Sequence, residues 1–175
     1  NRSFSSNPFV VSKLGKICIK KYHENRIGTV IKHIPGHGLS KVDSHNKLPI
    51  IKESINLLNK TDFLPFKKQN SFLAMTAHIV YSSIDSKNTA THSQKVINII
   101  RKKIGFKNII MSDDISMKSL KYSITKNTTQ AFNSGCDLVL HCNGKYKEML
   151  MVAKNSPLLN TFIIKKTSQL LNIIR

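Results

Sequence analysis

The apolar residues of the chain fall into two kinds of segment that alternate along the sequence. Short runs rich in β-branched residues, typical of strands buried on both faces of a sheet, occupy Thr29–Ile34, Phe72–Tyr81, Asn108–Met111 and Asp137–Cys142. Helical apolar spacing is found over 8–22, Ile51–Lys60, Ser93–Ile104, Ser116–Ser134, Tyr146–Lys154 and Thr161–Ile174. This alternation predicts parallel β/α units, and therefore an α/β fold. Four strands fit either a small doubly wound sheet or about half of an eight-stranded barrel, which periodicity does not separate.

The bulk properties favour one domain in a reducing compartment. A chain of 175 residues buries one ordinary core, and it has neither a run of about 20 apolar residues nor a secretory signal. The 3 cysteines form no CxxC pair, and an odd number argues against a disulfide framework. We therefore expect a cytoplasmic protein with no membrane partner.

The net charge of +19 suggests a nucleic acid or another anionic polymer as a partner. The positive residues are mostly Lys, however, and they are spread over the whole chain together with many Ile and Asn residues. That composition is typical of a genome rich in A and T, and no nucleic-acid reading module is present. We expect no nucleic-acid partner, and a basic non-catalytic binding protein remains the alternative.

Three of the four expected strands carry polar residues at or near their C-terminal ends. Lys32 and His33 lie in the first, His78 in the second, and Asp113 follows the third. Active sites of β/α folds gather at this edge. A further pair, Asp43 and His45, has the i, i+2 spacing that lets a carboxylate orient an imidazole for proton transfer.

Several longer motifs resemble those of one enzyme family. Residues 32–45 read KHIPGHG, four further residues and DSH, similar to the KH[FI]PGHG-x4-DSH signature of family 3 glycoside hydrolases of the bacterial β-N-acetylglucosaminidase branch. The RSF segment at 2–4, AHIVY at 77–81, SDDISM at 112–117 and GCDLVL at 135–140 follow in the family's order. Beyond about Asn155 there is no specific match.

The resemblance implies a TIM-barrel fold and a retaining exo-glycosidase that uses no cofactor and no metal. Asp113 would be the nucleophile, His45 the acid/base and Asp43 the group that orients it. Arg2, Lys32 and His33 would bind N-acetylglucosamine in the −1 site. The implied substrates are muropeptides carrying N-acetylglucosamine β-1,4-linked to anhydro-N-acetylmuramic acid, released during cell-wall recycling, and the full-length enzyme would be a monomer.

The histidine is unusual, because most retaining glycosidases use a carboxylic acid as acid/base. An imidazole there should tolerate anionic substrates better than a second carboxylate would. The two glycines after Ile34 also suggest a loop that closes over the substrate and brings in His45.

The resemblance also places residues 1–175 in the C-terminal portion of a single catalytic barrel. The family's barrel begins well before its RSF segment, so its early strands have no counterpart in this sequence. We expect either a piece of a longer protein or a truncated product of uncertain activity.

A metal-dependent hydrolase is a further alternative, since His33, His37, Asp43 and His45 are of ligand type. Pro35 and Gly36 exclude the helix that would bring His33 and His37 together, which disfavours this interpretation.

Overall fold

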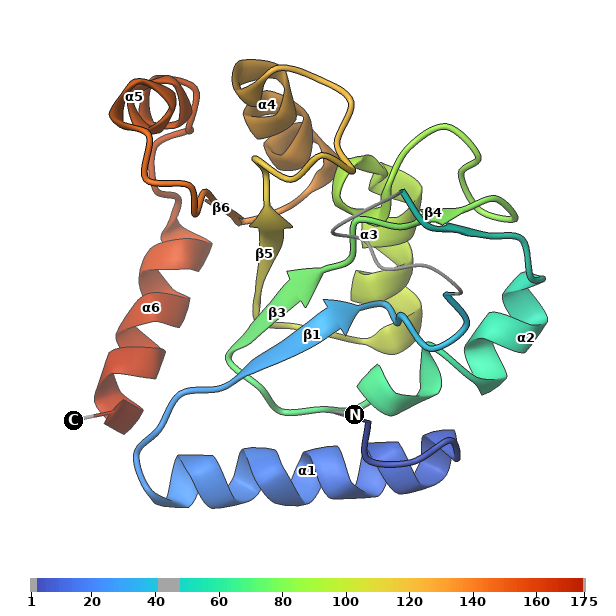
Figure 1. Cartoon of the computed structure of the whole chain (residues 1–175). Helices are drawn as coiled ribbons and strands as arrows, with labels where there is room; N and C mark the ends of the chain where they lie inside the picture. The colour runs from blue at the N-terminus through green and yellow to red at the C-terminus, as the bar shows by residue number, and fades with distance from the viewer. Residues whose placement is uncertain (1–2, 41–47, 175) are drawn as a thin grey trace.

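The computed structural model describes residues 3–40 and 48–174, and it contains a four-stranded parallel sheet (Figure 1). The strands are β1 (Val30–Ile34), β3 (Leu73–Thr76), β5 (Ile109–Asp114) and β6 (Leu138–Leu140), in the order β1-β3-β5-β6. All three neighbouring pairs are parallel. The α/β class and the expectation of four parallel, adjacent strands are thus confirmed, and the C-terminal ends of the strands meet at one edge.

The helices follow the predicted pattern, with caps that the sequence supplies. They are α1 (Pro8–Glu24), α2 (Ile55–Lys60), α3 (Gln94–Ile99), α4 (Ile124–Ser134), α5 (Tyr146–Lys154) and α6 (Thr161–Ile174). Single helical turns lie at η1 (Leu64–Phe66), η2 (Ala90–His92) and the π-helical η3 (Ile100–Ile104). The Asn7, Ser54, Ser93 and Ser123 side chains each accept a backbone N–H at a helix start. No described helix is long and apolar enough to cross a membrane.

The expected single strand over Phe72–Tyr81 is wrong. The chain leaves the main sheet after Thr76, and Val80–Tyr81 forms β4, which pairs in parallel with a two-residue strand β2 (Ile50–Ile51). The residues between, Ala77–Ile79, turn into the core, where both ring nitrogens of His78 find partners. The sequence conceals this switch, because residues 76–81 all stay buried from the end of β3 through β4.

Two predicted helices begin later than their apolar patterns suggested. Residues 51–54 belong to β2 and to the cap of α2, so that helix starts at Ile55 rather than at Ile51. The segment Ser116–Ser134 is helical only from Ile124, because the Asp114 carboxylate accepts the Ser116 N–H and holds the chain in a turn first.

The two faces of the main sheet differ in burial. On one, here called the packed face, Ala74, Thr76, Ile110 and Ser112 are 0% exposed. The core on this side includes Val96, Ile97 and Ile100 of α3 and η3, which lie behind the sheet in Figure 1. The alternating positions Leu73, Met75, Met111, Leu138 and Leu140 are only partly buried and define the open face. The register between β5 and β6 shifts between Met111 and Asp114, so the regular alternation ends before the two aspartates, and both of them are partly buried.

Candidate active site

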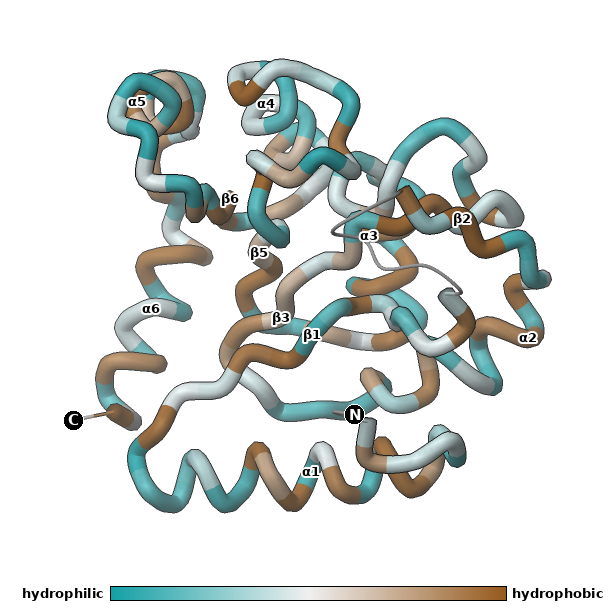
Figure 2. The backbone as a smooth tube through the Cα atoms, in the orientation of Figure 1, coloured by the Kyte–Doolittle hydropathy of each residue, from teal (hydrophilic) through white to brown (hydrophobic). Residues whose placement is uncertain are grey.

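Asp113 and His33 lie together at the C-terminal edge of the sheet. The distance between Asp113 Oδ2 and His33 Nε2 is 3.5 Å, and 16% and 31% of the two side chains are exposed. Figure 2 shows the hydrophobic colouring of β5 giving way to hydrophilic colouring toward this end of the strand. The arrangement leaves a partly buried carboxylate beside an imidazole.

The Asp113 carboxylate is oriented by the backbone of the following residue. The Asp114 N–H donates to Asp113 Oδ1 over 2.8 Å. One oxygen is thereby held, while the other lies toward His33. A carboxylate oriented in this way could act as a nucleophile or as a proton acceptor.

His33 is a neutral imidazole at neutral pH. Burial lowers its pKa to about 4, although the Asp113 carboxylate opposes the shift; Lys32 and His37 add to it. At 3.5 Å the contact with Asp113 is too long for a strong hydrogen bond, and it is not an ion pair when the ring is uncharged. His33 is therefore available to bind a hydroxyl group. Lys32, one position earlier on β1, has an exposed side chain.

The loop that follows β1 is fastened at its root. Gly36 has φ +149°, and a Cβ at this position would lie 2.5 Å from the Asp62 carbonyl oxygen, so only glycine fits. The Tyr81 hydroxyl donates to the Gly36 carbonyl, and the Leu39 N–H donates to Asp62 Oδ2 over 3.3 Å. Burial raises the pKa of Asp62 and, more strongly, that of Tyr81. Residues 36–39 are thus held at Gly36 and Leu39, and the predicted closure of the loop, which depends on His45, stays a prediction.

Asp62 and Tyr81 were not among the expected site residues. Asp62 lies 23 positions from Leu39, and Tyr81 lies 45 positions from Gly36. Neither belongs to a local pattern that indicates this contact, although Tyr81 closes the recognised AHIVY motif.

His78 reaches the same edge but not the open face. It is 1% exposed, and its Nε2 lies 3.0 Å from the carbonyl oxygen of Asp114. The structure therefore places it behind the site rather than in contact with a substrate.

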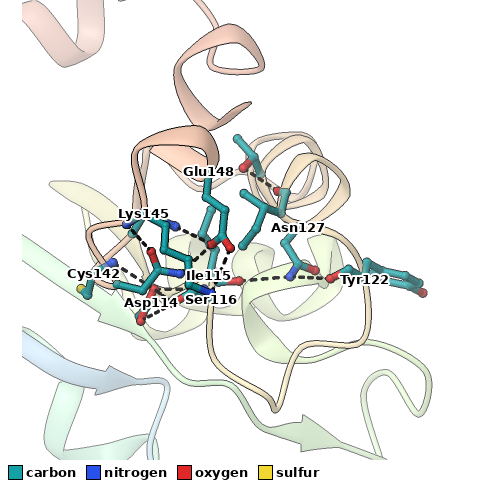
Figure 3. Close-up of polar contacts among 12 residues, drawn as sticks. Asp114, Ile115, Ser116, Tyr122, Asn127, Cys142, Lys145 and Glu148 are labelled. Carbon is teal, nitrogen blue, oxygen red and sulfur yellow. Dashed lines mark hydrogen bonds and ion pairs between the residues drawn. The ribbon is translucent and has the colours of Figure 1, made fainter. Parts of the chain in front are cut away.

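The Asp114 side chain accepts hydrogen bonds from three donors (Figure 3). Its Oδ1 accepts the backbone N–H groups of Ser116 (3.0 Å) and Cys142 (3.2 Å), and both its oxygens lie within 2.8 Å of the Ser116 hydroxyl. It joins the end of β5 to the segment that follows β6.

Three predicted site residues, Arg2, Asp43 and His45, lie outside the described residues, so their positions relative to Asp113 stay predictions. Within 3–40 and 48–174, no group of three or more His, Cys, Asp or Glu side chains could hold a metal ion. The alternative metal site of the sequence also includes Asp43 and His45, which lie outside the described residues.

Known proteins similar to this chain are named as glycosidases. A β-hexosaminidase from Neisseria meningitidis serogroup C is 35% identical over 148 residues, covering 82% of this chain and 41% of the relative. One from Shewanella frigidimarina is also 35% identical, with 81% and 43% covered. The chain thus spans about two fifths of the length of these curated relatives.

Solved structures agree with the sequence relatives. Native NagZ from Neisseria gonorrhoeae superposes with a TM-score of 0.85 at 31% identity, covering 97% of this chain and 50% of that protein. CbsA from Thermotoga neapolitana gives a TM-score of 0.81 at 29% identity, covering 99% and 42%. The four strands and their helices therefore have the fold of the matching part of these two structures. The family model described as the glycosyl hydrolase family 3 N-terminal domain matches residues 1–173, and the chain belongs to this family.

Proposed function

We propose that this chain supplies the nucleophile and part of the −1 sugar site of a retaining β-N-acetylglucosaminidase that releases N-acetylglucosamine from muropeptides in the cytoplasm. The observation that carries the proposal is the partly buried Asp113 carboxylate, held by the Asp114 N–H and 3.5 Å from His33. Family membership and the β-hexosaminidase relatives support the substrate class.

In the proposed first step, an Asp113 oxygen attacks the anomeric carbon of N-acetylglucosamine. The bond from that carbon to the leaving oxygen breaks as His45, oriented by Asp43, gives its proton to the oxygen. In the second step His45 takes a proton from water, the water oxygen attacks the same carbon, and the ester to Asp113 breaks. Two inversions give overall retention.

The remaining predicted groups bind the sugar. Lys32 and Arg2 would donate to its hydroxyl oxygens as cations. His33, which is neutral, would donate or accept one hydrogen bond and would also limit how far the Asp113 carboxylate swings. Because His33 is uncharged above about pH 4, it does not neutralise the nucleophile.

The decisive test is the activity of an Asp113→Ala variant of the naturally expressed protein. The substrate is 4-nitrophenyl N-acetyl-β-glucosaminide, and its hydrolysis is measured. Hydrolysis should fall by about 10⁴-fold or more, because no covalent intermediate forms. Added azide should then enter on the vacated side and yield the α-glycosyl azide with release of nitrophenolate. Glu24→Gln, on exposed α1, serves as the control and should match the parent. Unchanged hydrolysis by Asp113→Ala would refute the assignment.

His45→Ala tests the acid/base role with the same substrate. An activated aryl leaving group needs little protonation, so the first step should be spared while the second slows by roughly 10²–10⁴-fold. A pre-steady-state burst of nitrophenolate is expected, and azide should here give the β-glycosyl azide. Asp43→Ala should show the same pattern more mildly. A His45→Ala variant with the parental steady-state rate and no burst would contradict the role.

A further inference from the structure

His78 is a buried imidazole for which the proposed reaction has no direct use. It lies between β3 and β4, is 1% exposed, and its pKa is lowered mainly by burial. It is therefore neutral at neutral pH and carries one ring proton.

The partners of His78 determine which nitrogen carries that proton. Nε2 lies 3.0 Å from the Asp114 carbonyl oxygen, which accepts hydrogen bonds but cannot donate them, so the proton is on Nε2. Nδ1 must then accept from the Thr91 hydroxyl, 2.8 Å away. The Thr91 hydroxyl uses its one hydrogen to donate to His78. In the contact between Thr76 and Thr91, whose hydroxyl oxygens are 2.8 Å apart, Thr76 is therefore the donor. The chain of hydrogen bonds runs in one direction, from Thr76 through Thr91 and His78 to Asp114.

The three side chains of this hydrogen-bond series, Thr76, Thr91 and His78, all lie in the protein interior. Thr76 and Thr91 are both 0% exposed. A neutral imidazole gripped at both nitrogens in a close-packed setting has one orientation, so the Asp114 carbonyl meets a fixed donor.

The carbonyl held by His78 and the N–H that meets the nucleophile lie in the two peptide planes on either side of the Asp114 Cα. The Asp114 side chain is already tied to Ser116 and Cys142, and His78 restrains the carbonyl of the same residue. Because the side chain and the carbonyl of Asp114 are both restrained, its N–H keeps its direction toward Asp113 Oδ1. The distance between this nitrogen and Asp113 Oδ1 is 2.8 Å. Asp113 itself makes no other hydrogen bond among the described residues apart from its long approach to His33.

We propose that His78 is a positioning residue: by donating Nε2–H to the Asp114 carbonyl, it fixes the N–H that orients the Asp113 carboxylate. The inference rests on the proposed function only in so far as Asp113 is the nucleophile. The orientation of the Asp114 N–H is a property of the protein alone.

Two substitutions separate this role from mere filling of the core. The amide of His78→Gln reaches the position of Nε2 and can still donate to Asp114. The shorter amide of His78→Asn reaches only the position of Nδ1, keeps the contact with Thr91 and loses Asp114. His92 provides the matched control, since it is also a buried imidazole whose Nε2 approaches a carbonyl, that of Asn127 on α4, at 3.2 Å.

The first measurement is amide hydrogen exchange of Asp114 by NMR, which needs no substrate. His78→Asn should speed exchange of this amide by about tenfold or more, while His78→Gln and His92→Asn leave it near the parental rate. Equal exchange in His78→Asn and His78→Gln, or the same acceleration in His92→Asn, would overturn the proposal.

The second measurement is steady-state kinetics with 4-nitrophenyl N-acetyl-β-glucosaminide. Misalignment of the nucleophile should lower kcat of His78→Asn by roughly 10- to 100-fold with KM within about threefold, and His78→Gln should recover most of the loss. If Asp113→Ala kept activity, the proposed function would fail, yet the exchange result would still decide the positioning role. If Asp113→Ala were inactive while His78→Asn had the parental kcat, the positioning role alone would be refuted.

Discussion

The two neighbouring aspartates at the end of β5 differ in the number of hydrogen-bond donors that hold them. Asp113 has one backbone donor and a distant imidazole. Asp114 accepts hydrogen bonds from two backbone N–H groups and a hydroxyl through its side chain, and from an imidazole through its carbonyl. A carboxylate saturated with donors is a weak nucleophile, whereas a singly held one remains reactive. The comparison assigns chemistry to Asp113 and structural support to Asp114.

Truncation of one hydrophobic residue on each face should give the largest difference in stability. Ile110→Ala removes a side chain that is 0% exposed and should lower the free energy of unfolding by about 2–5 kcal/mol. Met111→Ala, next to it but partly exposed on the open face, should cost less than about 1.5 kcal/mol. Urea unfolding of both variants provides the measurement, and equal losses would remove the distinction between the faces.

The stability of the fold should depend on pH through the buried imidazole of His92. Burial lowers its pKa to about 4 from 6.5, so between these values the unfolded chain binds the proton and the folded one does not. Stability should therefore fall as pH drops from 6.5 toward 4 and show no such contribution above 6.5. His92→Gln keeps a donor for the Asn127 carbonyl and should remove up to about 3 kcal/mol of this acid sensitivity. Parallel stability curves for parent and variant between pH 7 and 4.5 would argue against a desolvated His92.

The two aspartates themselves provide the smallest and most direct contrast. Asp114→Ala leaves the Cys142 and Ser116 N–H groups without their acceptor and should destabilise the fold by about 1–3 kcal/mol. Asp113→Ala gives up one local hydrogen bond and should change the thermal midpoint little while abolishing hydrolysis. Thermal unfolding of the pair decides this, and the contrast fails if Asp113→Ala is the less stable protein.

The sequence predicted the strands and the polar edge well, because both depend on local patterns. The end of β5 and the KH pair of β1 stand next to apolar runs that identify them, and the family motifs supply the same residues. Contacts between distant segments carry no such signal. Arg101 binds the Asp137 carboxylate across 36 positions, and Asp62 supports the β1 loop across 23.

The break at Thr76 shows why the rest could not be predicted. Periodicity reports burial, and residues 77–81 stay buried when the chain changes from one sheet to the other. It does not report which way His78 points, and that orientation depends on Thr91 and on the Asp114 carbonyl. A polar residue at a strand end can thus indicate a site without touching its substrate.

The one-way order of donors from Thr76 to Asp114 also decides what the chain cannot do. A proton wire needs an acceptor at its far end that can take up a proton, and the Asp114 carbonyl cannot do so at neutral pH. The hydrogen bonds of Thr76, Thr91 and His78 therefore hold the Asp114 carbonyl in place and do not conduct protons. Their removal should change the rate of turnover without changing the solvent deuterium isotope effect, which should follow proton transfer at the acid/base alone.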